Sequence, residues 1–157
     1  MPFVGLSLRL SPNGIKCAAF APDSRSFVTG QQDGTIRWWD SETGGLFNTF
    51  GDKSGPVTSV AFGPNKQVAA GWAAGAVSIY DLDLGTENRL DSLPVVACVR
   101  WSPDGERLAV GLGYFQDSQG GVLVWDPSSS DQPDEFPLPQ PVGALSWLSD
   151  SSLVIAD

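Results

Sequence analysis

The stretch IKCAAFAPDSRSFVTGQQDGTIRWWD, residues 15–40, decides the architecture because its pattern recurs along the chain. An apolar run ends at Phe20, a turn and a second apolar run follow, and a third run closes on Trp39. Alternation at period 2 and enrichment in Val, Ile, Phe and Trp indicate strands rather than a helix. Asp33-Gly34 supplies the positive φ angles that a two-residue hairpin requires. The stretch therefore predicts three antiparallel strands.

The same pattern returns at intervals of roughly 40 residues, which is the period of propeller blades that close on a Trp-Asp pair. The aromatic residues that end the first strand of each copy are Phe20, Phe62, Trp101 and Trp147. The pairs that end the third strand are Trp39-Asp40, Tyr80-Asp81 and Trp125-Asp126. The chain is therefore interpreted as a repeat protein with three full copies and the start of a fourth.

The segments DGTIRWWD (33–40), SVAFGPN (59–65), VRWSPDGERLAVG (99–111) and VLVWD (122–126) resemble the WD-repeat β-propeller family. This resemblance covers nearly the whole chain. It implies an all-β fold of antiparallel four-stranded blades in an incomplete ring of about 3.5 to 4 blades. The expected partial propeller spans 1–157, with blades at about 15–50, 57–93 and 95–138, a partial blade at 142–157, and an outer strand of a preceding blade at 5–10.

Composition narrows the class of protein further. With 41% hydrophobic and 17% charged residues, the chain has a globular rather than a disordered composition. It holds no run of 18 apolar residues, so we expect no membrane span. Its first ten residues do not make a signal peptide, and a cytoplasmic setting is the expectation. Cys17 and Cys98 take equivalent places in two copies, where a small buried side chain explains them without a disulfide.

The charge balance indicates which partners to expect. A net charge of −9, from 9 basic and 18 acidic residues, opposes binding to phosphate backbones, and the cations are scattered along the chain. We therefore expect other proteins or peptides, rather than nucleic acid, as partners. Self-association through open blade faces is an alternative.

The residues argue against catalysis. The sequence contains no histidine, which excludes Ser-His-Asp and Cys-His chemistry and removes the commonest transition-metal ligand. Its repeated aspartates fall at turns and strand ends that the repeat itself explains, and no phosphate-binding glycine loop opens a helix. We expect no catalytic residue, metal or cofactor, and therefore no enzyme activity.

The family resemblance also implies a hydrogen-bond network inside each blade. In WD repeats, a histidine commonly joins a Ser or Thr of the second strand, the hairpin Asp and the closing Trp. Thr29, Asp33 and Trp39 match three of these places, and the histidine is absent. The resemblance therefore implies a partial network with less polar rigidity per blade.

Two sets of residues are candidates for partner contacts. In WD-repeat proteins, contacts often come from the second residue of a blade's first strand and from the residue before the hairpin Asp. The first position corresponds to Lys16, Thr58 and Ala97, and the second to Gln32 and Ala73, while an insertion leaves it unassigned in the third blade. That insertion carries the second candidate set, the loop aromatics Tyr114 and Phe115. The alternatives are that Lys16 and Gln32 are simply solvated, and that the loop aromatics fold back over the blade edge.

The functional hypothesis from the sequence is a non-catalytic protein-interaction scaffold. One alternative is a regulatory or sensor propeller fused to an enzyme outside this chain. Another is a self-assembling half-propeller. The fourth copy stops where its second strand would end, so a fragment of a longer polypeptide is the expectation.

Overall fold

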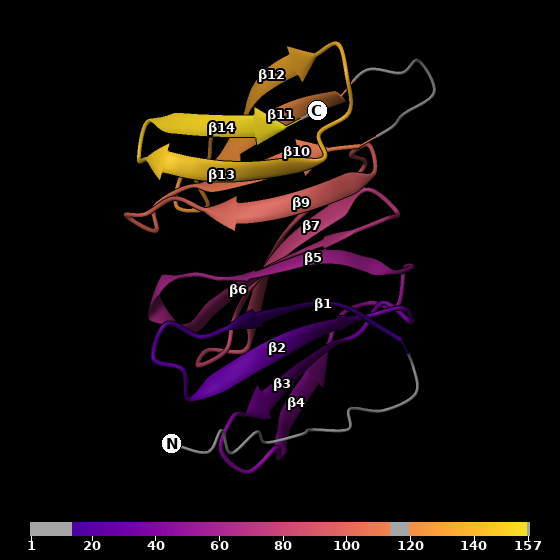
Figure 1. Cartoon of the computed structure of the whole chain (residues 1–157), viewed down its shortest axis with the longest axis vertical. Coiled ribbons are helices and arrows are strands. Elements are labelled where there is room, and N and C mark those ends of the chain that lie inside the picture. Colours follow the sequence, from indigo (N-terminus) through magenta and orange to yellow (C-terminus); the bar gives the residue numbers. More distant parts are fainter. Residues whose placement is uncertain (1–13, 114–119, 157) are drawn as a thin grey trace, which may run out of the picture.

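The structure, a computed structural model, describes residues 14–113 and 120–156. These residues form antiparallel sheets that stack one upon another in chain order, from an N-terminal sheet at one end to a C-terminal hairpin at the other (Figure 1). The outer strand expected at 5–10 and the loop aromatics Tyr114 and Phe115 lie outside the described residues.

The first sheet has the order β1-β2-β3-β4. Its strands are β1 (Ile15–Phe20), β2 (Ser26–Gln31), β3 (Ile36–Asp40) and β4 (Leu46–Phe50). Between β2 and β3, Gly34 takes a φ of 82° and the Asp33 carboxylate accepts the Thr35 N–H at 3.0 Å. The Asp-Gly pair therefore makes the tight turn that the sequence predicts.

The second sheet repeats this arrangement in the order β5-β6-β7-β8. Its strands are β5 (Val57–Phe62), β6 (Gln67–Trp72), β7 (Ala76–Asp81) and β8 (Thr86–Leu90). A short 3-10 helix, Pro64–Lys66, joins β5 to β6. The β6–β7 turn has no aspartate, yet Gly75 holds a φ of 84°, so glycine alone preserves the turn.

The third sheet is complete and the fourth is not. The third contains β9 (Val96–Trp101), β10 (Leu108–Leu112), β11 (Gly120–Trp125) and β12 (Asp134–Leu138). The fourth is a hairpin of β13 (Ala144–Ser149) and β14 (Ser152–Ala156). The fold class predicted from sequence is confirmed: the sheets are those of a β-propeller, and the described strands do not close a ring.

The first strands of the sheets lie on one side of the stack (Figure 1). β5 contacts β1 and β9, and β9 contacts β13. Apolar side chains fill each junction between sheets, with Val28 and Ile36 of the first sheet packed against Trp72 of the second. Such side chains contribute about 1.5–3 kcal/mol each when fully buried, so the stability of each sheet depends on its neighbours.

A glycine near the end of each second strand allows the next sheet to approach. A Cβ on Gly30 would come within 2.5 Å of Val57, on Gly71 within 2.4 Å of Val96, and on Gly111 within 2.7 Å of Val142. Across the sheet these glycines pair with small residues, namely Cys17, Ser59 and Cys98. The junction therefore explains why a thiol or hydroxyl recurs at that place in β1, β5 and β9.

In the part of the chain that the structure describes, no helix is long and apolar enough to cross a membrane.

Candidate functional site

One hydrogen bond recurs in three sheets and gathers the predicted contact positions at one end. The backbone N–H of Gln32 donates to Gly14 O at 2.9 Å, that of Ala73 to Pro56 O at 3.0 Å, and that of Gly113 to Val95 O at 2.7 Å. Lys16, Thr58 and Ala97 stand two residues after these carbonyls. We call the end of the sheets that carries Lys16, Gln32, Thr58, Ala73 and Ala97 the Lys16 face.

The side chains of the Lys16 face differ in availability. Lys16 and Gln32 are exposed, and neither side chain makes a hydrogen bond or ion pair to a described residue. The Thr58 hydroxyl donates to Gly71 O at 3.0 Å within its own sheet, so it is already used. Ala73 and Ala97 are half-buried. Lys16 and Gln32 are therefore the polar side chains that a partner could bind here.

The third sheet adds a residue that the sequence left unassigned. Gly113 makes the hydrogen bond that Gln32 and Ala73 make in the first two sheets, and it therefore takes the equivalent place in the third. Gly113 and Ala97 line a surface hollow of about 570 Å³ with Gln140 and Pro141. The insertion after Gly113 obscured this equivalence in the sequence, because it changes the spacing from which the position is counted in the other two copies.

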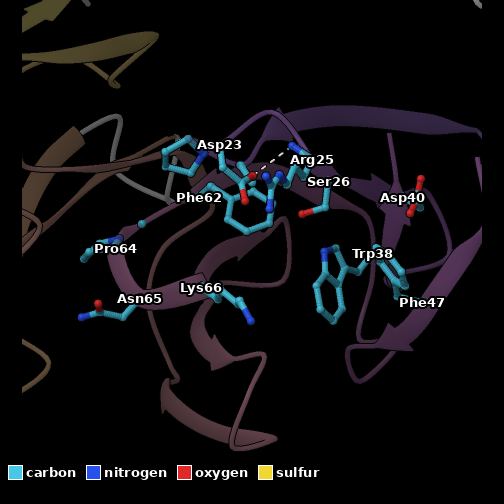
Figure 2. Close-up of a pocket in the computed structure, with 13 residues that line it drawn as sticks. Asp23, Arg25, Ser26, Trp38, Asp40, Phe47, Phe62, Pro64, Asn65 and Lys66 are labelled. Carbon is cyan, nitrogen blue, oxygen red and sulfur yellow. Dashed lines mark hydrogen bonds between the residues drawn. The ribbon is translucent and has the colours of Figure 1, made fainter. Parts of the chain in front are cut away.

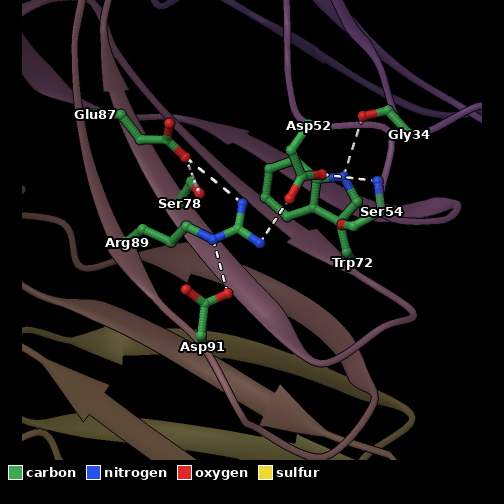
Figure 3. Close-up of polar contacts among 8 residues, drawn as sticks. All are labelled: Gly34, Asp52, Ser54, Trp72, Ser78, Glu87, Arg89 and Asp91. Atoms are coloured by element: carbon green, nitrogen blue, oxygen red, sulfur yellow. Dashed lines mark hydrogen bonds and ion pairs between the residues drawn. The ribbon is translucent and has the colours of Figure 1, made fainter.

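A polar cluster fixes the β2–β3 turn, which carries Gln32, to the second sheet (Figure 3). The indole of Trp72 is fully buried and donates from Nε1 to Gly34 O at 3.1 Å. The guanidinium of Arg89 lies 5.7 Å from the centre of the Trp72 ring. It also pairs with Asp52 at 2.6 Å, just before the second sheet. Residues of the second sheet and of the segment before it thus hold the turn in place.

Arg89 bridges three carboxylates, since it also approaches Asp91 at 2.7 Å and Glu87 at 3.7 Å (Figure 3). Burial opposes ionisation of Asp52, but hydrogen bonds from Ser54 and the charge of Arg89 outweigh it and hold the pKa of Asp52 below its usual value. The Asp52–Arg89 pair therefore stays ionised at neutral pH. Nothing in the repeat pattern marks these side chains, because they meet only when the sheets stack.

The hydrogen-bond network inside the first sheet is partial, in line with the missing histidine. Trp39 donates from Nε1 to Thr29 Oγ1 at 2.9 Å, as the family pattern implies. The Asp33 carboxylate instead accepts the Thr35 hydroxyl at 2.6 Å. The buried amide of Gln31 donates to Thr29 at 2.7 Å, while its oxygen has no partner among the described residues. Gln31 thus reaches the hydroxyl without completing the network.

The thiols do not form a reactive site. Both cysteines are free, Cys98 buried and Cys17 half-buried. Burial raises the pKa of the Cys17 thiol to about 11 and also raises that of Cys98. Both therefore carry a proton at neutral pH and are poor nucleophiles. Within residues 14–113 and 120–156, no group of three or more His, Cys, Asp or Glu side chains could hold a metal ion.

A second hollow lies at the opposite end of the junction between the first two sheets (Figure 2). We call it the Trp38 groove. It measures about 690 Å³, and its walls include Trp38 and Phe47 of the first sheet and Phe62 of the second. Arg25 of the β1–β2 turn and Lys66 of the short helix also line it. The sequence pattern assigned these aromatics to strands. It gave no sign that some remain exposed.

The stacked four-stranded sheets with their first strands on one side define the class of β-propeller proteins. The family model "WD domain, G-beta repeat" matches residues 6–40 and 90–126. The chain therefore contains WD repeats in these two regions, as its motifs predict.

Three relatives and one solved structure illustrate the likeness. The chain is 31% identical to a periodic tryptophan protein 2 homolog of Dictyostelium discoideum. The matched region covers 68% of this chain and 12% of that protein. It is 33% identical to the guanine nucleotide-binding protein subunit beta of Arabidopsis thaliana, over 62% of this chain and 29% of that one. The small ribosomal subunit protein RACK1 of Schizosaccharomyces pombe is 31% identical, over 67% of this chain and 38% of the relative.

The solved structure is the β-propeller domain of Cps50 (Swd1) from Myceliophteria thermophila, with a TM-score of 0.79 at 18% identity. The similarity covers 96% of this chain and 51% of that propeller. The chain thus spans about half the length of that propeller and a smaller share of the three relatives.

Proposed function

We propose that the chain acts as a non-catalytic scaffold that binds other proteins or peptides through the Lys16 face, in a cytoplasmic setting. The observation that carries the proposal is the hydrogen bond repeated in three sheets, which gives the predicted contact residues equivalent places in their sheets. A rigid frame that presents several turns side by side suits binding more than chemistry. The two regions that match the WD-repeat family model support the same function.

Lys16 and Gln32 are the side chains that orient a partner in this proposal. A charged ammonium and an amide provide directional hydrogen bonds, and neither has a described partner within the chain. Ala73 and Ala97 add contact area beside them. Tyr114 and Phe115 follow Gly113 in the sequence and form the competing contact set.

We expect Lys16→Glu and Gln32→Ala to weaken capture of a partner by the protein without lowering its melting temperature, because exposed side chains without contacts contribute little to folding. The measurement is quantitative affinity capture with wild-type and variant proteins, paired with thermal unfolding. Arg25→Glu is the matched control, since it reverses one charge at the other end of β1. If Tyr114→Ala and Phe115→Ala abolish capture while Lys16→Glu has no effect, the contact lies on the inserted loop instead.

Exposed apolar side chains on the end sheets favour a second candidate function, association between copies of the chain. Phe20 on β1 is 65% exposed, and Leu148 on β13 is 73% exposed. Apolar surface of this kind promotes association. Sedimentation of the purified 157-residue chain is expected to reveal oligomers. A monomer at all concentrations that melts in one cooperative transition would contradict this candidate.

A further inference from the structure

The Trp38 groove lies between the first two sheets, beside the β1–β2 turn and the Pro64–Lys66 helix (Figure 2). At the other end of the same junction, Phe50 packs on Tyr80 with ring centres 4.6 Å apart, and Trp72 is fully buried. In the groove, Trp38 packs on Phe47 of the same sheet, with ring centres 4.7 Å apart, and Phe47 is 51% exposed. The junction thus leaves an aromatic surface uncovered at this end. Its volume lies in the range of ligand-binding pockets.

The carboxylates around the groove already have hydrogen-bond partners. Asp23 accepts the backbone N–H of Arg25 at 2.9 Å. Asp40 accepts two backbone N–H groups in the β3–β4 turn, at 2.8 and 2.7 Å. Lys66 is paired with Asp83 at 2.7 Å. These contacts hold the turns that form the rim.

Two donors of the groove have no partner among the described residues. The guanidinium of Arg25 makes no hydrogen bond or ion pair there, although the residue is exposed on the β1–β2 turn. The Trp38 indole N–H is buried and likewise has no acceptor. A buried donor without an acceptor is unfavourable. The groove can therefore bind a ligand that offers hydrogen-bond acceptors and an apolar surface.

From this complementarity we propose that the Trp38 groove binds an extended peptide that presents a large apolar side chain next to a single carboxylate. The apolar side chain packs on Trp38 and Phe47, and the carboxylate pairs with Arg25, whose planar fork suits it. A peptide carbonyl supplies the acceptor that the Trp38 N–H lacks. Asp23 and Asp40 disfavour a strongly acidic peptide, so one carboxylate fits better than several.

This site lies at the opposite end of β1 from the Lys16 face and does not depend on it. The test uses the 157-residue protein and a labelled peptide, acetyl-Ser-Leu-Phe-Glu-Ser-amide. Matched peptides replace its glutamate by glutamine or lysine, or its Leu-Phe pair by Ser-Ser. Fluorescence polarisation gives the affinity. The ¹H–¹⁵N resonance of the Trp38 indole, identified by its absence in Trp38→Phe, reports whether the groove is occupied.

We expect the glutamate peptide to bind and to shift the Trp38 resonance, and each replaced peptide to bind about tenfold or more weakly. Arg25→Glu should weaken the glutamate peptide by a similar factor and favour the lysine peptide, and Phe47→Ser should weaken both. Lys16→Glu, which makes the same change in net charge, should leave the affinity unaltered.

The proposal is overturned if wild-type protein prefers the lysine peptide, if Lys16→Glu weakens binding as much as Arg25→Glu, or if the Trp38 resonance stays in place. Lack of any binding of the glutamate peptide up to about 1 mM also overturns it. Loss of partner capture in Lys16→Glu with intact peptide binding separates this site from the Lys16 face.

Discussion

Replacing Trp72 by alanine is expected to lower the free energy of unfolding by about 3–5 kcal/mol, the range for truncating a fully buried aromatic residue. Trp72 is 0% exposed and packs in the core between the first two sheets. Its loss also removes the donor to Gly34 O and the ring beneath Arg89. The change therefore weakens the attachment of the β2–β3 turn to the second sheet as well as the core.

Urea unfolding followed by circular dichroism measures this loss. Trp72→Phe keeps an aromatic ring but leaves Gly34 O without its donor, so we expect a smaller loss of about 1–3 kcal/mol. Trp147→Ala is the matched control. That indole also donates to a backbone carbonyl of the preceding sheet, Arg100 O at 3.0 Å, but it is only half-buried. Equal losses for Trp72→Ala and Trp147→Ala would contradict a central role for Trp72.

The importance of Trp72 could not be predicted from the repeat. In the three complete sheets, the residue after the glycine near the end of the second strand is Gln31, Trp72 or Leu112. All three are buried, but a glutamine, a tryptophan and a leucine share no pattern. What the sequence did predict is local: period-2 strands and turns marked by proline, aspartate and glycine. Contacts between sheets depend on how the sheets stack, and the sequence of a single strand does not predict this.

The same division applies to the candidate sites. The register of β1 and β5 follows from their terminal aromatics, so Lys16 and Thr58 could be aligned without a structure. Gly113 could not, because the inserted residues that follow it disturb the alignment. The exposure of Phe47 was also hidden, since an aromatic on a strand usually packs in a core and its uncovered state depends on the opening between two sheets.

The second large loss of stability is expected from a substitution in a glycine turn, that between β6 and β7. In Gly75→Ala, the added Cβ would lie 1.9 Å from Leu93 O, a contact with backbone that no side-chain rotation relieves. Gly75 O also accepts the Leu93 N–H at 2.9 Å, so the β6–β7 turn and the segment before the third sheet are tied together. A residue with a side chain also resists a φ of 84°, at a cost of about 1–2 kcal/mol. Overpacking adds about 1–3 kcal/mol.

We therefore expect Gly75→Ala to lower the free energy of unfolding by about 2–5 kcal/mol. Gly85→Ala separates the cost of the backbone conformation from that of overpacking, because Gly85 has a φ of 67° but nothing within 4 Å of its Cβ position. We expect Gly85→Ala to lower the free energy of unfolding only by the backbone cost of about 1–2 kcal/mol. Faster hydrogen exchange at the Leu93 amide should accompany Gly75→Ala only. If both variants lose the same stability, the turn does not press on residues 93–94, and the placement of Ala73 beside it does not depend on this contact.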